Sequence, residues 1–242
     1  MKINRLYDKF FKNNLVARFT DKYIDPIDSL TEIFFSVMIV LIFTLAYNII
    51  ASTTLALPNA SEDRTLKILI GALGAVIAWG IIDGVIYAVL SLFEREEMNR
   101  FLSDALAAES EQERVEIVEQ ELDELLAQIV REDQKVEVIH AISQRLKAPQ
   151  GKLAQITKDD LLAGVSHLII AVITVIPSLL PLLIFSHNSL LAIRISTGVS
   201  ILILFITGMR WGKYTGVSPF RTGFIIALVA ILLSFLAILL GG

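Results

Sequence analysis

The sequence predicts an all-α membrane protein with five transmembrane helices and a helical cytoplasmic insert between spans 2 and 3. Of its 242 residues, 55% are hydrophobic and only 19% are charged, a balance typical of chains embedded in a lipid bilayer. Five segments have the roughly 20 mostly apolar residues that a bilayer-crossing helix needs. One acidic stretch interrupts them. The pattern divides the chain into a cytoplasmic amphipathic segment (1–29), spans 1 and 2 (30–93), the insert (94–160) and spans 3 to 5 (161–242).

The five predicted spans cover residues 30–52, 68–93, 161–185, 190–209 and 222–240, and positive charge is distributed unevenly between their two sides. One side carries Lys2, Arg5, Lys9, Lys12, Arg18, Lys22, Arg210, Lys213 and Arg221, whereas the other carries Arg64, Lys67 and Arg194. Because positive residues concentrate in cytoplasmic loops, we expect the N-terminus in the cytoplasm and the C-terminus on the far side. Short loops and the lack of a recognisable targeting segment favour an integral, multi-pass protein of a prokaryotic inner membrane.

The first 29 residues combine cations with apolar side chains at helical intervals. Leu6, Phe10, Leu15 and Phe19 are the apolar members of this pattern. Such a pattern predicts a helix that lies on the cytoplasmic face of the bilayer. A solvated tail is the alternative.

The insert differs from the rest of the chain because it contains 17 acidic and 9 basic residues. Ser110 and Glu113 form a capping box, which predicts a helix that starts there. An apolar stripe follows at Val115, Val118, Leu122, Leu125 and Ile129. A second amphipathic helix is predicted over residues 133–147, and span 2 is expected to continue through residues 91–107. The insert is therefore predicted to be a three-helix unit.

Acids within the spans are the first candidates for a transport pathway, because ionisable groups in a bilayer usually face a pathway, a partner or a cavity. Asp28 and Glu32 are four residues apart and share one helix face at the cytoplasmic start of span 1. Asp83 lies in span 2, about ten residues or roughly 15 Å from its cytoplasmic end. Met38 offers a soft thioether further along span 1. The alternatives are an interfacial helix cap for Asp28 and a hydrogen-bonded structural acid for Asp83.

The insert supplies a second set of candidates, which would bind a metal ion. Its members are Glu94, Glu97, Asp104, Glu109, Glu113 and Glu116. Their spacing places them near one face of consecutive helical turns, and carboxylate clusters suit cations such as Mn²⁺ and Fe²⁺. An ordinary solvated helix face, partly neutralised by neighbouring arginines, explains the same spacing.

Other chemistry has little support in the sequence. There is no Cys, which excludes disulfides and thiolate metal ligands. His140, His167 and His187 do not form a ligand motif, and His167 near the start of span 3 is either a proton carrier or a hydrogen-bonded structural histidine. Phosphate-binding glycine loops and nucleophile–histidine pairs are missing too. We therefore expect no enzymatic activity, no permanently bound cofactor and no nucleic-acid partner.

The C-terminal half of the chain resembles the vacuolar iron transporter family. The segment "VIPSLLPLLIF" (175–185) is similar to the proline-bearing third span of that family, with Pro177 and Pro181. The loop "GMRWGKYTGVSPFRTG" and a small-residue fifth span continue the resemblance over about 80 residues. In the N-terminal half, "PIDSLTE" keeps the acid Asp28 but has Ser29 where the family has glycine, and "DGVIY" carries its acid, Asp83, about one turn from the usual position.

The resemblance implies a divalent metal transporter that exports Fe²⁺ or Mn²⁺ from the cytosol, as a homodimer whose first spans line the pathway. Acids of the insert would capture the metal, and Asp28 and Glu32 would receive it. Carboxylates that face each other could exchange protons for the cation, as a metal/proton antiporter requires. Pro177 and Pro181 interrupt helical hydrogen bonds, so they could act as a hinge or as plain packing kinks.

Two functional hypotheses follow from the sequence. The first is the transporter of iron or manganese, with the lipid bilayer, the metal ion and a second copy of the chain as its partners. The alternative is a membrane scaffold that transports nothing, whose acidic amphipathic insert mediates dimerisation or binds another protein.

Overall fold

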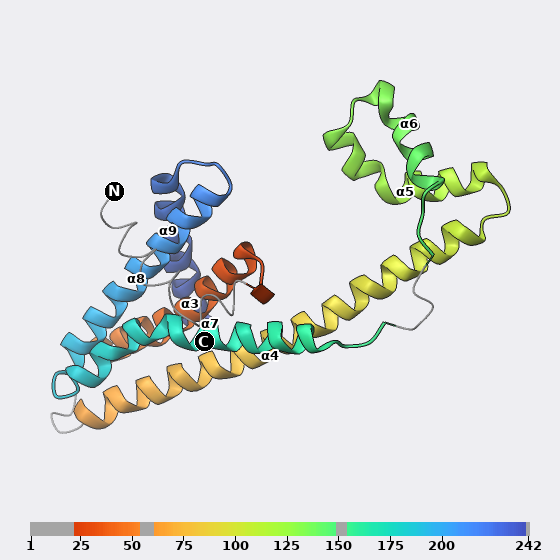
Figure 1. Cartoon of the computed structure of the whole chain (residues 1–242). Helices are drawn as coiled ribbons and strands as arrows, with labels where there is room; N and C mark the ends of the chain where they lie inside the picture. The colour runs from red at the N-terminus through yellow and green to blue at the C-terminus, as the bar shows by residue number, and fades with distance from the viewer. Residues whose placement is uncertain (1–21, 54–60, 149–153, 241–242) are drawn as a thin grey trace. The chain divides into compact units, whose positions relative to one another are not determined.

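The structure is a computed structural model that describes residues 22–53, 61–148 and 154–240, and every regular element in these ranges is a helix. Figure 1 shows the helices α3 (Pro26–Thr53), α4 (Ser61–Ala107), α5 (Glu111–Ile129), α6 (Glu132–Ser143), α7 (Lys158–Ile184), α8 (Ser189–Tyr214) and α9 (Pro219–Leu239). The predicted amphipathic helix at the N-terminus lies almost wholly outside the described residues.

Five of the described helices are long and apolar enough to cross a bilayer, which confirms the predicted fold class. The spans are Pro26–Tyr47, Thr65–Ala107, Lys158–Ile184, Ser189–Tyr214 and Pro219–Leu239. The chain divides into two compact units. We call residues 1–87 with 158–242 the membrane unit and residues 88–157 the insert unit. The division falls inside α4, because that helix runs without a break from Ser61 to Ala107, as the sequence predicts.

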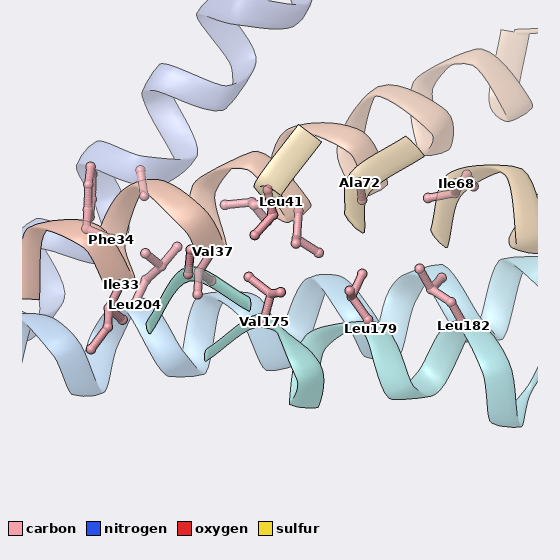
Figure 2. Packing of buried hydrophobic residues seen from close by; sticks show 14 of the residues in the cluster. Ile33, Phe34, Val37, Leu41, Ile68, Ala72, Val175, Leu179, Leu182 and Leu204 are labelled. Atoms are coloured by element: carbon pink, nitrogen blue, oxygen red, sulfur yellow. The ribbon is translucent and has the colours of Figure 1, made fainter. Parts of the chain in front are cut away.

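The core of the membrane unit is built mainly from α3, α4, α7 and α8. Val37, Val40 and Leu41 of α3 are fully buried, because their spacing keeps them on one face of the helix. Figure 2 shows Val37 and Leu41 close to Val175 and Leu179 of α7. Since α3 runs through this core, a polar side chain on its buried face must find a partner inside the unit.

Glycines allow the closest helix contact in the membrane unit. Gly84 of α4 and Gly164 of α7 meet backbone to backbone, and a Cβ built on Gly164 would lie 2.7 Å from the Gly84 carbonyl oxygen. One turn earlier on α4, a Cβ on Gly80 would lie 2.9 Å from the Leu168 Cα. Small residues of this kind are the usual means of close packing between membrane helices. The contact fixes the separation of α4 and α7 at the depth of Asp83.

The insert unit has a small core of its own, formed by Ala105, Val118, Leu126 and Ile139. The Ser110 cap predicted at the start of α5 is present, because the Glu113 amide donates to Ser110 Oγ. The Glu113 side chain reaches back one residue further than a capping box requires and accepts from the Glu109 amide. Lys135 of α6 pairs with Asp123 of α5. That hydrogen bond raises the pKa of Lys135 above its ordinary value. These contacts join α5 to α6 as a hairpin.

Pro177 and Pro181 both lie inside α7, which remains helical from Lys158 to Ile184. Pro177 is exposed on the surface of the membrane unit, whereas Pro181 is buried. A proline lacks an amide hydrogen, so two carbonyl groups of the preceding turns lose their usual helical donors. A hinge at these residues stays a prediction.

Candidate metal centre

Three ionisable side chains from three different helices meet inside the membrane unit. They are Glu32 of α3, Asp83 of α4 and His167 of α7, and one possible ligand atom from each lies within 4.8 Å of the other two. His167 Nδ1 is 2.7 Å from Asp83 Oδ2 and 3.8 Å from Glu32 Oε2. We call these residues the triad. No other group of three His, Asp or Glu residues in the described part of the chain meets the same distance condition.

The local sequence explains how each member reaches the triad. Glu32 lies on the buried face of α3, one turn before Ser36 and in register with the apolar residues of the core. Asp83 directly precedes Gly84, and His167 follows Gly164 by three residues, so the glycine contact brings both side chains to one place. The close approach of α4 and α7 therefore creates the site.

Burial of the triad is unusual for charged groups. Glu32 is 2% exposed and His167 is 4% exposed, while the side chain of Asp83 is 30% exposed. An uncompensated charge at such a depth costs several kcal/mol, so these residues need each other or a bound ion. Asp83 is the member that is open to surrounding solvent or ions.

Two donors hold the Glu32 carboxylate in position. Ser36 Oγ donates to Glu32 Oε1 at 3.0 Å, and Trp79 Nε1 donates to Glu32 Oε2 at 3.3 Å. Phe35 packs against the Trp79 ring, with the ring centroids 5.2 Å apart. Each oxygen of Glu32 thus has one supporting donor and keeps lone pairs that could bind a cation. Partners of this kind orient the ligands of metal sites.

His167 lacks a hydrogen bond that would fix its tautomer. Nδ1 lies 2.7 Å from Asp83 Oδ2, at ion-pair distance, but neither ring nitrogen makes a well-directed hydrogen bond among the described residues. The Tyr87 ring lies against the imidazole, with centroids 4.9 Å apart. An imidazole buried between two carboxylates offers nitrogen and oxygen atoms that could together bind a metal ion.

The charges of the triad match those of a divalent cation. Two ionised carboxylates and a neutral imidazole carry two negative charges, which one divalent ion would balance. Without the ion, protons on the same atoms would lower the electrostatic cost. The triad can therefore hold either a metal ion or protons.

A hollow of about 250 Å³ lies beside Tyr87 at the start of α7. It is lined by Lys22, Tyr23, Tyr87, Asp159, Asp160 and Ala163. Tyr87 borders this hollow and also contacts the His167 ring, so one side chain touches both the hollow and the triad. The carboxylates on its wall would attract cations.

The structure brings together two of the four residues predicted to line a pathway. Glu32 and Asp83 join the triad, whereas Asp28 is half-buried in the first turn of α3 and is not one of its members. The Ile27 amide donates to Asp25 Oδ1, so Asp25 supplies a capping contact at this helix start. Met38 packs against the apolar core, six residues beyond Glu32. Asp28 and Met38 remain predicted pathway residues.

The six acids predicted to bind metal in the insert are all exposed. They are Glu94, Glu97 and Asp104 on α4, Glu109 just after it, and Glu113 and Glu116 on α5. Glu113 is engaged in the capping box. None of the six belongs to a group of three ligand residues within the described ranges. Their metal binding stays a prediction.

Sequence reasoning underrated His167 and did not single out Trp79. A histidine in an apolar span is ambiguous, because a single sequence does not distinguish a hydrogen-bonded structural histidine from a metal ligand. The available signal was that His167 lies inside an apolar span, as Glu32 and Asp83 do. Trp79 gave no signal, because a tryptophan in a membrane helix is commonly an apolar packing residue.

Comparison with known proteins gives one match. The family model described as the VIT family matches residues 92–242, which is more than half of the chain. The matched region contains His167 and the helices α5 to α9, while Glu32 and Asp83 precede it. No curated protein and no solved structure matches the chain significantly.

Proposed function

The chain belongs to the VIT family, the vacuolar iron transporters, and from this premise we propose that it carries Fe²⁺ or Mn²⁺ out of the cytosol in exchange for protons. Membrane transport of metal ions is the activity of the family. The observation that supports the finer statement is the buried triad of Glu32, Asp83 and His167.

The ligand types favour a transition metal over Mg²⁺ or Ca²⁺. Hard cations prefer oxygen ligands, whereas imidazole nitrogen suits iron and zinc and tolerates manganese. Two carboxylates and one imidazole combine hard oxygen ligands with a softer nitrogen ligand, which suits metal ions of intermediate softness. Fe²⁺ and Mn²⁺ bind such sites less tightly than Zn²⁺ does, which also lets them leave the site again.

Proton exchange follows from competition for the same atoms. A carboxylate or an imidazole must lose its proton before it can coordinate a metal. Metal arriving from one side would displace protons from Asp83 and His167, and protons arriving from the other side would release the metal. This alternation is the chemical requirement for an antiporter.

Access to the triad would run through the hollow beside Tyr87. The carboxylates of Asp159 and Asp160 would concentrate cations there, and rotation of the Tyr87 ring would open the way to His167. The exposed acids of the insert would add a long-range attraction for cations. Pro177 and Pro181 would allow α7 to flex during the cycle.

A homodimer and a scaffold role are supported by a different observation. Leu125 and Ile129 of α5 and Val136 of α6 are exposed on the insert unit, at 57%, 70% and 62%. Exposed apolar groups of this kind on a soluble helical hairpin suit a protein partner, such as a second copy of the chain. The scaffold alternative would use this surface without any transport.

The proposal predicts that each triad member is needed for metal binding. In Glu32→Gln, Asp83→Asn and His167→Gln, affinity for Mn²⁺ should fall by more than about 100-fold, while loss of a supporting donor in Trp79→Phe should cost about 10-fold. The binding of Mn²⁺ to purified protein can be measured by calorimetry, and Mn²⁺ uptake by proteoliposomes with an imposed pH gradient.

Glu124→Gln is the matched control, because it neutralises an exposed acid of α5 far along the sequence from the triad. Asp28→Asn tests the remaining pathway residue in the same assays. Undiminished affinity in all three triad variants would contradict the proposed site. A folded wild-type protein that neither binds nor transports Fe²⁺ or Mn²⁺ would contradict the transporter and favour the scaffold.

A further inference from the structure

Three buried hydroxyl groups in the membrane unit lack a hydrogen-bond partner among the described residues. They belong to Ser178 of α7 and to Thr197 and Ser200 of α8. Other hydroxyls in α7, α8 and α9 bond to the backbone of their own helix: Ser166 donates to the Leu162 carbonyl, Thr207 to Ile203 and Ser234 to Ala230. Such back-bonding is the usual solution in membrane helices, so its absence at three positions is informative.

Ser178 and Ser200 lie on the helix faces through which α7 and α8 meet, and Thr197 follows Ser196 in the sequence of α8. The helices are antiparallel neighbours, and Ser196 Oγ donates to the Ser178 carbonyl oxygen. Since both helices rise equally per residue, this contact places Ser200 at the level of Thr174 and Thr207 at the level of His167. Ser178, Ser196 and Ser200 are completely buried. Ser196 and Ser200, one turn apart on α8, therefore share the face that contacts α7 at Ser178.

Ser178 shares one face of α7 with His167 of the triad. On α7, His167, Ala171, Thr174 and Ser178 follow one another at intervals of four, three and four residues, and all are buried. The distance from His167 to Ser178 is about 16 Å along the helix. On α3, Ser36 donates to Glu32 and lies one turn further along the helix than this member of the triad. The polar groups thus extend from the triad toward the far end of α7.

A water molecule can supply the hydrogen bonds that these hydroxyl groups lack. An unpaired buried hydroxyl costs about 1 to 3 kcal/mol, and a buried water typically bonds to two to four polar groups. A hydroxyl both donates and accepts, so hydroxyls and waters in alternation can relay a proton. We propose that Ser178, Thr197 and Ser200 hold a chain of water molecules that carries protons between the triad and the far side of the membrane.

The chain would carry protons and exclude the metal. A divalent cation in a low-dielectric interior needs anionic ligands. The buried ionisable residues in the described part of the membrane unit are Glu32, Asp160 and His167, and with the half-buried Asp83 all of them precede Thr174 along α7 or lie at the triad. Metal and protons would therefore use different routes away from the triad. This inference rests on the proposed exchange of metal for protons.

The test compares two transport modes of the full-length protein in proteoliposomes. Net Mn²⁺ uptake driven by a pH gradient requires proton movement, whereas exchange of ⁵⁴Mn²⁺ for Mn²⁺ at equal pH does not. In the triple variant Ser178→Ala, Thr197→Val, Ser200→Ala, net uptake should fall by about tenfold or more, because proton relay through positioned groups is lost. Isotope exchange and Mn²⁺ affinity should stay within about twofold of wild type. Ser234→Ala is the control, since it removes a buried hydroxyl that is already bonded to its own helix.

The outcomes separate this inference from the proposed function. Unchanged net uptake in the triple variant would overturn the proton chain, and so would an equal loss of net uptake and isotope exchange in a variant that still binds Mn²⁺ and melts like wild type. Wild-type exchange without any response to a pH gradient would also overturn it, while leaving metal transport intact. A wild-type protein without Mn²⁺ binding would instead refute the proposed function.

Discussion

Gly84 and Gly164 are the residues on which the geometry of the triad depends most directly. Their backbones are in contact, so any side chain at either position must push α4 away from α7. Asp83 is the neighbour of one glycine, and His167 is one helical turn from the other. Overpacking at this point would therefore affect both the stability of the membrane unit and the distance between the two ligands.

We predict that Gly84→Ala destabilises the protein by about 1 to 3 kcal/mol, the usual cost of overpacking, and weakens Mn²⁺ binding. Thermal unfolding in detergent and calorimetry are the measurements. Gly74→Ala is the control on the same helix, because a Cβ there meets nothing within 4 Å. Equal melting temperatures for the two variants would show that the contact is less tight than described.

The acids of the site could be predicted at the residue scale, but their partners could not. Glu32 and Asp83 stand out because a carboxylate in an apolar span needs a reason to be there. His167 could be identified as a member only once the crossing of α4 and α7 was known. Spacing within one helix gives the face that a residue occupies, and it says nothing about which other helix covers that face.

At the scale of the helices, the start of α5 was predicted from local sequence alone, because Ser110 and Glu113 mark it. Ser110 accepts from the Glu113 amide, as the pattern of the capping box requires, and the Glu113 side chain accepts from the Glu109 amide, one residue before the expected donor. The bonds are formed by residues within a few positions of one another. Local sequence therefore suffices to place this helix start.

The loss of the cap should be measurable without disturbing the membrane unit. Ser110→Ala should destabilise the start of α5 by about 1 kcal/mol, because the Glu113 amide loses its acceptor. Hydrogen exchange of amides 111–114 should become faster, while exchange in α8 stays the same. Ser103→Ala removes an exposed hydroxyl of α4 and serves as the control. Unchanged protection in Ser110→Ala would mean that packing, and not the cap, holds the first turn.

The acids of the insert show where helix-scale prediction stops. Their spacing correctly indicates an exposed face on α4 and α5, but a metal site needs side chains from several turns to converge on one point. Glu113 illustrates the difficulty, because the same residue satisfies a capping pattern and a ligand pattern. In the structure it serves the cap.

At the scale of the whole molecule, the number of spans follows from hydrophobicity and the orientation from charge. Five described helices confirm the number. The orientation stays a prediction, since a bundle of helices can be inserted in either direction. The arrangement of the helices around the triad lay beyond the sequence, because apolar faces of similar composition can pair in several ways.

The chain contains no Cys, so single cysteines can report the orientation. We predict that a membrane-impermeant maleimide labels His187→Cys, in the turn between α7 and α8, from outside intact cells. Val217→Cys, in the turn between α8 and α9, should be labelled only after the membrane is permeabilised, because its flanking Arg210, Lys213 and Arg221 favour the cytoplasm. The wild-type chain gives the background. The reverse pattern would mean that the N-terminus lies outside.

The backbone contact between Gly84 and Gly164 also implies how the triad could tell one ion from another. Long side chains around an ion can adjust to its radius, but two backbones in contact cannot move any closer together. Asp83 and His167 are attached to the two sides of this contact, so the rigid backbones limit how far the two ligands can shift to suit ions of different radius. A site built in this way would discriminate between divalent ions by size as well as by ligand preference.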